Sequence, residues 1–177
     1  MMHRTEFADS VKEAILAAFK GTPAPDDDEL VVDPSSYDLE SSEVASAFRS
    51  KEWMEVTVGM VHEYKEALPL FTPTAFRYYL PAYMIACVVS YYAVDVALDS
   101  VIFNLTPPSE RSGWKWDFFW ARTKLFSRGE REAILLFLKL MEQYEIRDWA
   151  TEGKVPPENR LNTAVDFWSR LSAGNIP

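Results

Sequence analysis

The sequence predicts an all-α protein, a single compact multi-helix domain of roughly six to eight helices. Apolar residues recur at helical spacing along most of the chain, and several of these segments begin with a hydroxyl residue or a proline that favours a helix start. The sequence shows no β-hairpin pattern of alternating segments joined by a short glycine turn. Because 177 residues is a usual size for one domain, we expect residues 1–177 to form a single helical domain.

The first predicted helix covers residues 5–20, with Thr5 as its cap and Gly21 as its stop. Its apolar positions recur at helical spacing and are Phe7, Val11, Ile15 and Phe19. The following segment, 21–37, is rich in proline, aspartate and serine. We therefore expect an acidic, solvated loop after the first helix.

Two further helices are predicted between residues 38 and 68. Asp38 or Ser41 can cap a helix that contains Val44 and Phe48. Ser50 then opens a second helix, whose apolar side runs from Trp53 to Leu68.

The segment Thr72-Pro73 is a strong helix start, because a hydroxyl cap is followed by proline at the first helical position. The helix that follows extends to about Ser90 and contains Pro81. Since proline lacks a backbone donor, we expect this helix to be kinked or divided at Pro81. Another helix is expected from Val94 to Phe103.

The last third of the chain predicts three more helical segments. The aromatic segment from Trp114 to Phe126 is the first, although Lys115-Trp116-Asp117-Phe118 also permits an extended start. The second begins at Ser127, which forms a capping-box pattern with Glu130, and continues to about Tyr144. Residues 146–177 then form a C-terminal helical extension whose last helix follows two prolines.

The central segment of the chain is Leu70-Phe71-Thr72-Pro73-Thr74-Ala75-Phe76-Arg77-Tyr78-Tyr79-Leu80-Pro81-Ala82-Tyr83-Met84. It resembles a bacterial domain-of-unknown-function family whose members share a Phe-Thr-Pro-x-Ala-Phe-Arg-Tyr-Tyr-Leu-Pro-Ala-Tyr core. The resemblance implies a bacterial, cytoplasmic, helical protein. It implies no activity and no catalytic residues.

The net charge of −9 lies entirely in the first third of the chain, since residues 1–66 contain 15 acids and 6 bases. An acidic surface repels nucleic acids and anionic membranes, so neither is an expected partner. It attracts basic proteins, although negative charge also serves solubility. The acidic run Asp26, Asp27, Asp28 and Glu29 is the candidate partner-binding segment.

Three residues form a candidate polar site: Arg77, Asp95 and Asp99. The two aspartates lie four positions apart on one helix face, where close carboxylates suit a metal or general-acid pair. The alternative is a structural salt bridge to Arg77 or to an arginine of residues 111–131, and we expect this structural role. His62 and Glu63 lack the second histidine of a zinc-protease helix, and the sequence predicts no metal and no cofactor.

Residues 111–131 combine bases with tryptophan and phenylalanine and carry a local charge of +4. Such a pattern suits stacking of single-stranded nucleic acid, but it also fits bases that pair with the acidic first third. The second interpretation agrees better with the total charge. The one cysteine, Cys87, lies in an apolar run, which indicates buried packing in a reducing compartment.

These observations predict a non-enzymatic, cytoplasmic bacterial protein that binds another protein. An immunity-type protein that neutralises a basic toxin is one form of this function. The alternative is a carboxylate-dependent hydrolase that uses Asp95 and Asp99. The pattern predicts no particular oligomeric state.

Overall fold

A computed structural model describes residues 2–35, 38–154 and 160–175 of the chain. Within these ranges it contains eight α-helices, two 3₁₀ turns and no β-strand beyond one isolated bridge, which confirms the all-α prediction. In chain order the elements are α1 (Met2–Phe19), η1 (Asp27–Glu29), α2 (Leu39–Phe48), η2 (Trp53–Glu55), α3 (Val58–Glu63), α4 (Pro73–Val89), α5 (Asp95–Leu105), α6 (Trp114–Thr123), α7 (Arg128–Thr151) and α8 (Arg160–Ser172).

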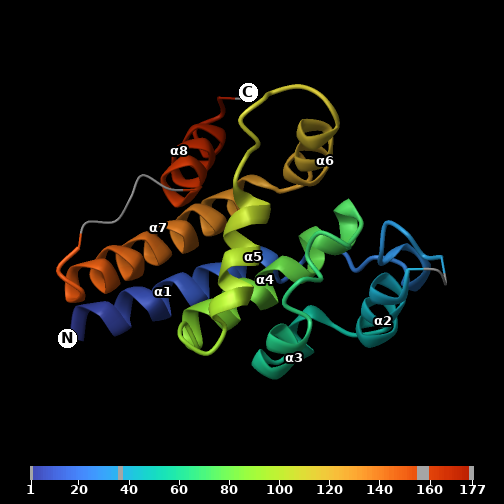
Figure 1. The fold of residues 1–177 in the computed structure, drawn as a ribbon, viewed down its shortest axis with the longest axis horizontal. Helices are drawn as coiled ribbons and strands as arrows, with labels where there is room; N and C mark the ends of the chain where they lie inside the picture. The colour runs from blue at the N-terminus through green and yellow to red at the C-terminus, as the bar shows by residue number, and fades with distance from the viewer. Residues whose placement is uncertain (1, 36–37, 155–159, 176–177) are drawn as a thin grey trace.

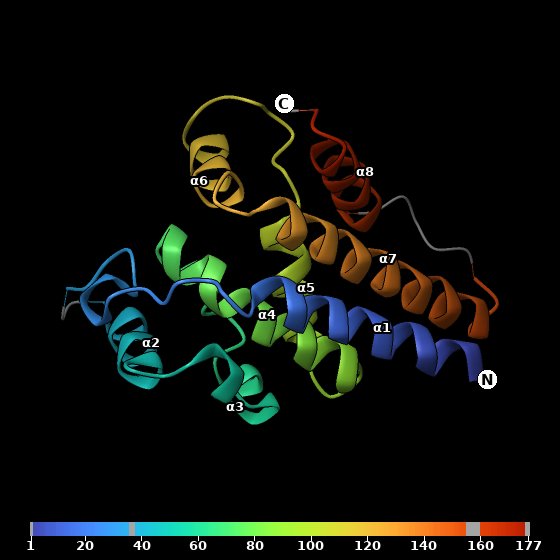
Figure 2. The same cartoon turned by 180° about the vertical axis from the view of Figure 1, so that it is seen from behind.

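Helices α1 and α7 lie side by side and run in opposite directions (Figures 1 and 2). Helix α8 packs on α7, while α4 packs on α1 and against α5. The acidic segment with η1 and α2 lies at the end of the long axis opposite the N-terminus of α1 (Figure 1). Within the described ranges, every helix is too short or too polar to cross a membrane.

Helix α4 is the central element of the core. Thr72 caps it, since its Oγ1 accepts a hydrogen bond from the amide of Ala75 at 3.2 Å, and Pro73 stands in its first turn. The helix continues through Pro81, so the proline does not divide it. Twelve of its residues are buried, which explains why an unfavourable proline is tolerated in its interior.

The predicted helix over residues 50–68 is wrong in part, because the chain forms two short elements, η2 and α3, in its place. Ser50 has a φ of 54°, a left-handed conformation that no helix accommodates. Thr57 then accepts a hydrogen bond from the amide of Met60 at 3.2 Å and starts α3 separately. The apolar residues of 50–68 have helical spacing, but the left-handed Ser50 and the separate cap at Thr57 prevent one continuous helix.

The loop after α1 is more firmly packed than its composition predicts. Leu30 and Val31 are buried, and Val31 forms an isolated antiparallel bridge with Phe71. The amide of Val32 donates to the carbonyl of Leu70 at 2.9 Å. The prediction of a solvated loop over 21–37 therefore does not hold at these two apolar residues, which contribute to the core.

The C-terminal region is also part of the core. Helix α7 ends at Thr151, seven residues beyond the predicted end at Tyr144. The indole of Trp168 in α8 is fully buried and donates to the carbonyl of Leu105 at 2.8 Å. The two prolines that were expected to precede this last helix lie outside the described residues. The described part of 146–177 thus packs against the domain, and α8 covers α7.

An aromatic cluster joins α2 to α4. The Tyr79 ring lies 4.9 Å from Phe48 and 5.2 Å from Phe71, measured between centroids. Its hydroxyl donates to the carbonyl oxygens of Phe48 and Lys51, each at 2.9 Å. Burial raises the pKa of Tyr79 above its ordinary value. The ring fills the core while the hydroxyl fixes the end of α2.

We expect Tyr79→Ala to lower the free energy of unfolding by about 3–5 kcal/mol, because it removes a buried ring. Tyr79→Phe keeps the ring and loses the two carbonyl contacts, so it is expected to cost about 1–3 kcal/mol. Urea unfolding followed by circular dichroism measures both values. A Tyr79→Ala protein as stable as wild type would contradict the structural role of this residue.

Candidate functional site

The charge of the chain is concentrated at one end of the molecule. Residues 26–66 contain 12 acids and 3 bases, whereas residues 1–25 contain three of each, so the net charge of −9 belongs to 26–66. We name the described part of this range, 26–35 and 38–66, the acidic end. It comprises η1, α2, η2 and α3 and packs on the start of α4 (Figures 1 and 2).

The four predicted partner-binding residues lie together in the acidic end but differ in their contacts. Asp26, Asp28 and Glu29 have exposed side chains. Asp27 is half-buried, and its carboxylate accepts from the amide of Ser50 at 2.7 Å and from its hydroxyl at 2.6 Å. Of the four predicted partner-binding residues, Asp27 therefore also has a structural role, because it binds Ser50 in its left-handed conformation.

A hollow of about 540 Å³ lies between the acidic loop and α2. Asp27, Asp28 and Arg49 contribute charged groups to it, and Leu30 and Val31 contribute apolar atoms. Asp28 and Arg49 are 3.8 Å apart and both are well exposed, so their ion pair contributes little stability. Leu30 and Val31 are buried, so the exposed groups of the hollow are mainly the charged side chains of Asp28 and Arg49.

Arg77, the first residue of the candidate polar site, binds Glu130. Its Nε lies 3.1 Å from both carboxylate oxygens, and its Nη2 lies 3.0 Å from Oε2. Glu130 is 1% exposed and also accepts from the Thr22 hydroxyl at 2.7 Å and the Ser127 amide at 2.6 Å. Three segments of the chain, α4, the loop after α1 and α7 with its cap, therefore meet at one carboxylate, and Arg77 makes a structural ion pair there.

The two aspartates of the candidate polar site lie on α5. Asp95 begins this helix, but its side chain is outside the described part of the structure. The side chain of Asp99 is exposed. Among the described residues, no group of three or more His, Cys, Asp or Glu is placed to hold a metal ion. The hydrolase hypothesis stays a prediction from the sequence.

Cys87 is fully buried in α4, and burial raises the pKa of its thiol. A thiol with a raised pKa is a poor nucleophile, because the thiolate is the reactive form. This agrees with the packing role that its apolar neighbours indicate.

The bases of residues 111–131 make other contacts than those expected. The ion pair that the structure shows for this segment joins Arg128 to Glu132 within α7. Arg122 is buried, and its Nη2 donates to the carbonyls of Pro69 and Phe71, each at 2.8 Å. Burial lowers the pKa of Arg122 to about 10. The predicted pairing of these bases with the acidic first third is therefore wrong for the described contacts.

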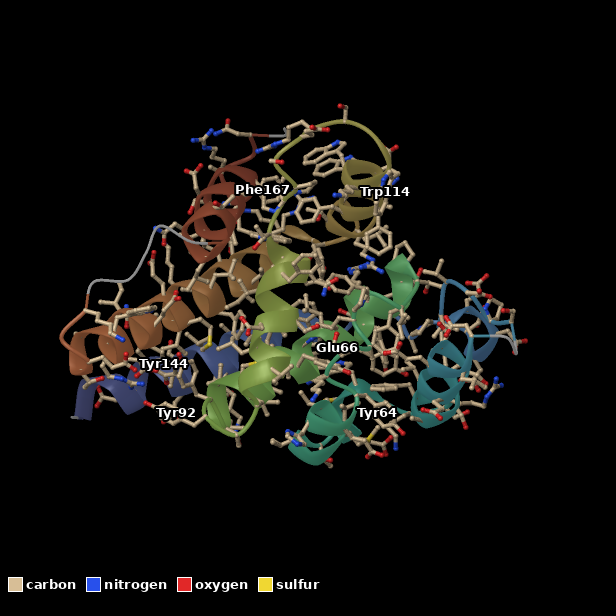
Figure 3. The ribbon with its side chains drawn as sticks, viewed as in Figure 1. Tyr64, Glu66, Tyr92, Trp114, Tyr144 and Phe167 are labelled. Carbon is tan, nitrogen blue, oxygen red and sulfur yellow. The ribbon has the colours of Figure 1, made fainter. Side chains whose placement is uncertain are left out.

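A second polar cluster, which the sequence did not indicate, joins the α4–α5 turn to α7. The Tyr92 hydroxyl accepts from Arg147 at 2.6 Å and donates to Asp148 at 3.1 Å. The Arg147 guanidinium lies 5.2 Å from the Tyr144 ring centroid. Hydrogen bonds from Arg147 and Tyr92 lower the pKa of Asp148 despite the opposing effect of burial. Tyr92 and Tyr144 lie close together in Figure 3, and this cluster binds the turn to the helix.

We expect Arg77→Met to lower the free energy of unfolding by about 3–5 kcal/mol, because it leaves the buried Glu130 carboxylate without its counter-ion. Chemical unfolding measures this loss. Arg128→Met breaks an exposed pair with Glu132 and is expected to cost under about 1 kcal/mol. Equal effects of the two substitutions would contradict the central role of the Arg77–Glu130 pair.

The stabilisation from Asp27 is expected to depend on pH. Its hydrogen bonds to Ser50 hold the pKa of Asp27 below the ordinary value of 3.8. Stability from this carboxylate is therefore present above the ordinary pKa and is lost as the pH falls through the lower pKa of the folded state.

Asp27→Asn is accordingly expected to lower the melting temperature at neutral pH, and the difference from wild type should shrink near about pH 2–3. Differential scanning calorimetry at both pH values measures this change. Asp28→Asn is the matched control, since Asp28 makes only an exposed ion pair, and it should melt like wild type. A pH-independent difference for Asp27→Asn would contradict this account.

One comparison identifies the chain at the family level. The model of a family described as Family of unknown function (DUF6714) matches residues 7–170, a range that includes the acidic end and the Arg77–Glu130 pair. Searches of the curated proteins and of the solved structures give no significant match. Since the family model spans nearly the whole domain from α1 to α8, the chain belongs to this family of unknown function, DUF6714.

Proposed function

We propose that this protein acts without catalysis, by binding a basic protein through its acidic end. Neutralisation of a basic toxin by an immunity-type protein is the form of this function that we favour. The observation that carries the proposal is the segregation of charge, since the whole net charge of −9 belongs to residues 26–66.

The exposure of these charges supports the proposal. Ten of the twelve acids in the range have exposed side chains, and the other two, Asp27 and Asp38, each bind a serine. The ion pair that the structure shows in this range, Asp28 with Arg49, is a weak one. Like charges held close together produce a field that steers an oppositely charged protein and raises its association rate.

The contacts of the acidic end with the core also favour binding. Tyr79 holds the carbonyls at the end of α2, and the Thr72 hydroxyl donates to the carbonyl of Glu29 at 2.6 Å. These contacts fix the backbone that carries the charges before a partner arrives. A preorganised surface loses less conformational freedom on binding.

Two of the candidate chemical groups, Arg77 and Cys87, have structural roles, which supports binding. Arg77 pairs with Glu130, and Cys87 is buried with a raised pKa. We infer that the Phe71–Tyr83 segment is the structural core that members of the family share. Its residues are largely buried, which supports this role.

The test of this function is the association rate with the partner. Affinity capture from the native host and mass spectrometry identify the partner, which we expect to be basic. The triple substitution Asp26→Asn, Asp28→Asn, Glu29→Gln removes three exposed charges and leaves Asp27 in place. We expect it to lower the association rate by about tenfold at low salt and to change dissociation much less. Stopped-flow kinetics at several salt concentrations measures both rates.

The matched control removes three acids outside the acidic end: Asp9→Asn, Glu13→Gln and Glu142→Gln. This variant has the same net charge as the triple variant, so a general effect of charge would slow both equally. We expect the control to associate like wild type. Equal rates for wild type and the Asp26, Asp28, Glu29 variant at low salt would limit the acidic end to a role in solubility.

A further inference from the structure

Helix α6 presents an exposed aromatic stripe, in which one face of the Phe118 ring packs on the Arg122 guanidinium, 3.7 Å from the ring centroid. Trp114 is 74% exposed and Phe118 is 39% exposed, and both lie on one side of the helix because they are four positions apart. Figure 3 shows Trp114 on the outer side of α6. Exposed aromatic residues of this size are typical of interaction surfaces.

Lysines flank this stripe on both sides. Successive residues of an α-helix are about 100° apart, which places Lys115 on one side of Trp114 and Phe118 and Lys124 on the other. Both lysines are exposed, and the Lys115 ammonium lies 5.7 Å from the Trp114 ring centroid. We name these four residues, Trp114, Lys115, Phe118 and Lys124, the α6 face.

The α6 face is positively charged although the chain as a whole is negative. Residues 111–131 contain six bases and two acids, and one of the acids is the buried Glu130. Arg111 lies 5.0 Å from the Trp116 ring centroid, so an aromatic ring is its described neighbour. Of the six bases, Arg122 is buried and Arg128 pairs with Glu132, so the positive charge of the α6 face comes from Lys115 and Lys124. The exposed Asp117 lies between Trp114 and Lys124 and offsets part of this charge.

The α6 face and the acidic end lie in the same half of the molecule. In both views, α6 and α2 are on the side away from the N-terminus of α1 (Figures 1 and 2). A two-fold axis beside this half would bring the α6 face of one copy to the acidic end of another and would repeat the same contact in reverse. Such paired, self-complementary contacts are the commonest basis of dimers.

We propose that a second copy of this chain covers the α6 face, so that two copies form a two-fold dimer in which each α6 face binds the partner's acidic end. Asp28 and Glu29 supply the charges that match Lys115 and Lys124. Val32 and Leu39, which are 59% and 73% exposed, supply apolar surface for the aromatic stripe. The proposal does not rest on the proposed function, but it uses the same acidic end, so a second copy and a basic partner compete for Asp28 and Glu29.

The experiment is sedimentation velocity of the purified full chain over a range of concentrations. We expect a monomer–dimer equilibrium that weakens as salt rises from about 50 mM to about 500 mM. The double variant Lys115→Glu, Lys124→Glu makes the α6 face acidic, so that it repels the acidic end of the second copy. The double variant Asp28→Lys, Glu29→Lys makes that segment basic, so that it repels the α6 face. Each double variant is expected to raise the dimer dissociation constant by at least about tenfold.

Mixing the two double variants is the decisive measurement. In the mixed pair, the acidic α6 face of one variant meets the basic segment of the other, and the second contact is the original pairing. We therefore expect the mixture to restore a heterodimer of about wild-type affinity. A general loss of folding in either variant cannot produce this rescue.

The matched control is Lys139→Glu with Lys154→Glu, which reverses two exposed lysines outside both surfaces and should dimerise like wild type. Three results would overturn the proposal. The first is a wild type that stays monomeric at all concentrations, and the second is a mixture of the double variants without heterodimer. The third is a monomer that binds a single-stranded oligonucleotide through its α6 face, with a binding that Trp114→Ala abolishes. The last result would assign the α6 face to nucleic acid.

Discussion

The carboxylate of Glu130 is buried, and it joins segments that are far apart in the sequence. It receives hydrogen bonds from Arg77 of α4, from Thr22 after α1 and from its own cap residue Ser127. A buried charge is costly unless its partners are present, so the positions of α1, α4 and α7 are coupled at this group. The acidic end depends on the same arrangement, because it is anchored to the start of α4.

Polar atoms of buried aromatic side chains bind other backbone segments to the core. The Tyr83 hydroxyl donates to the carbonyl of Tyr64 at 2.7 Å, and the Trp168 indole donates to the carbonyl of Leu105. Each ring fills the core while its polar atom binds a backbone carbonyl near a helix end. The aromatic content of the chain thus serves both apolar burial and the placement of loops.

The sequence predicted those features that depend on neighbouring residues. The helix starts at Thr72 and Ser127 follow from local capping patterns, and the structure confirms both. Arg77 and Glu130 are 53 positions apart, so no local pattern reveals their pairing. The break after α2 was predicted, but the left-handed conformation of Ser50 was not, because it depends on Asp27, 23 positions earlier. Likewise, Leu30 and Val31 belong to the core because Phe71 is positioned beside them.

The contact between Thr22 and Glu130 spans 108 positions, and α1 packs against α7 over much of its length. During synthesis, helix α1 is therefore made long before the helix that covers it. At usual rates of translation, its apolar face waits about 5–20 s for α7. The apolar face of this N-terminal helix therefore stays uncovered until residues near 150 have left the ribosome, so the α1–α7 core forms late in the synthesis of this domain.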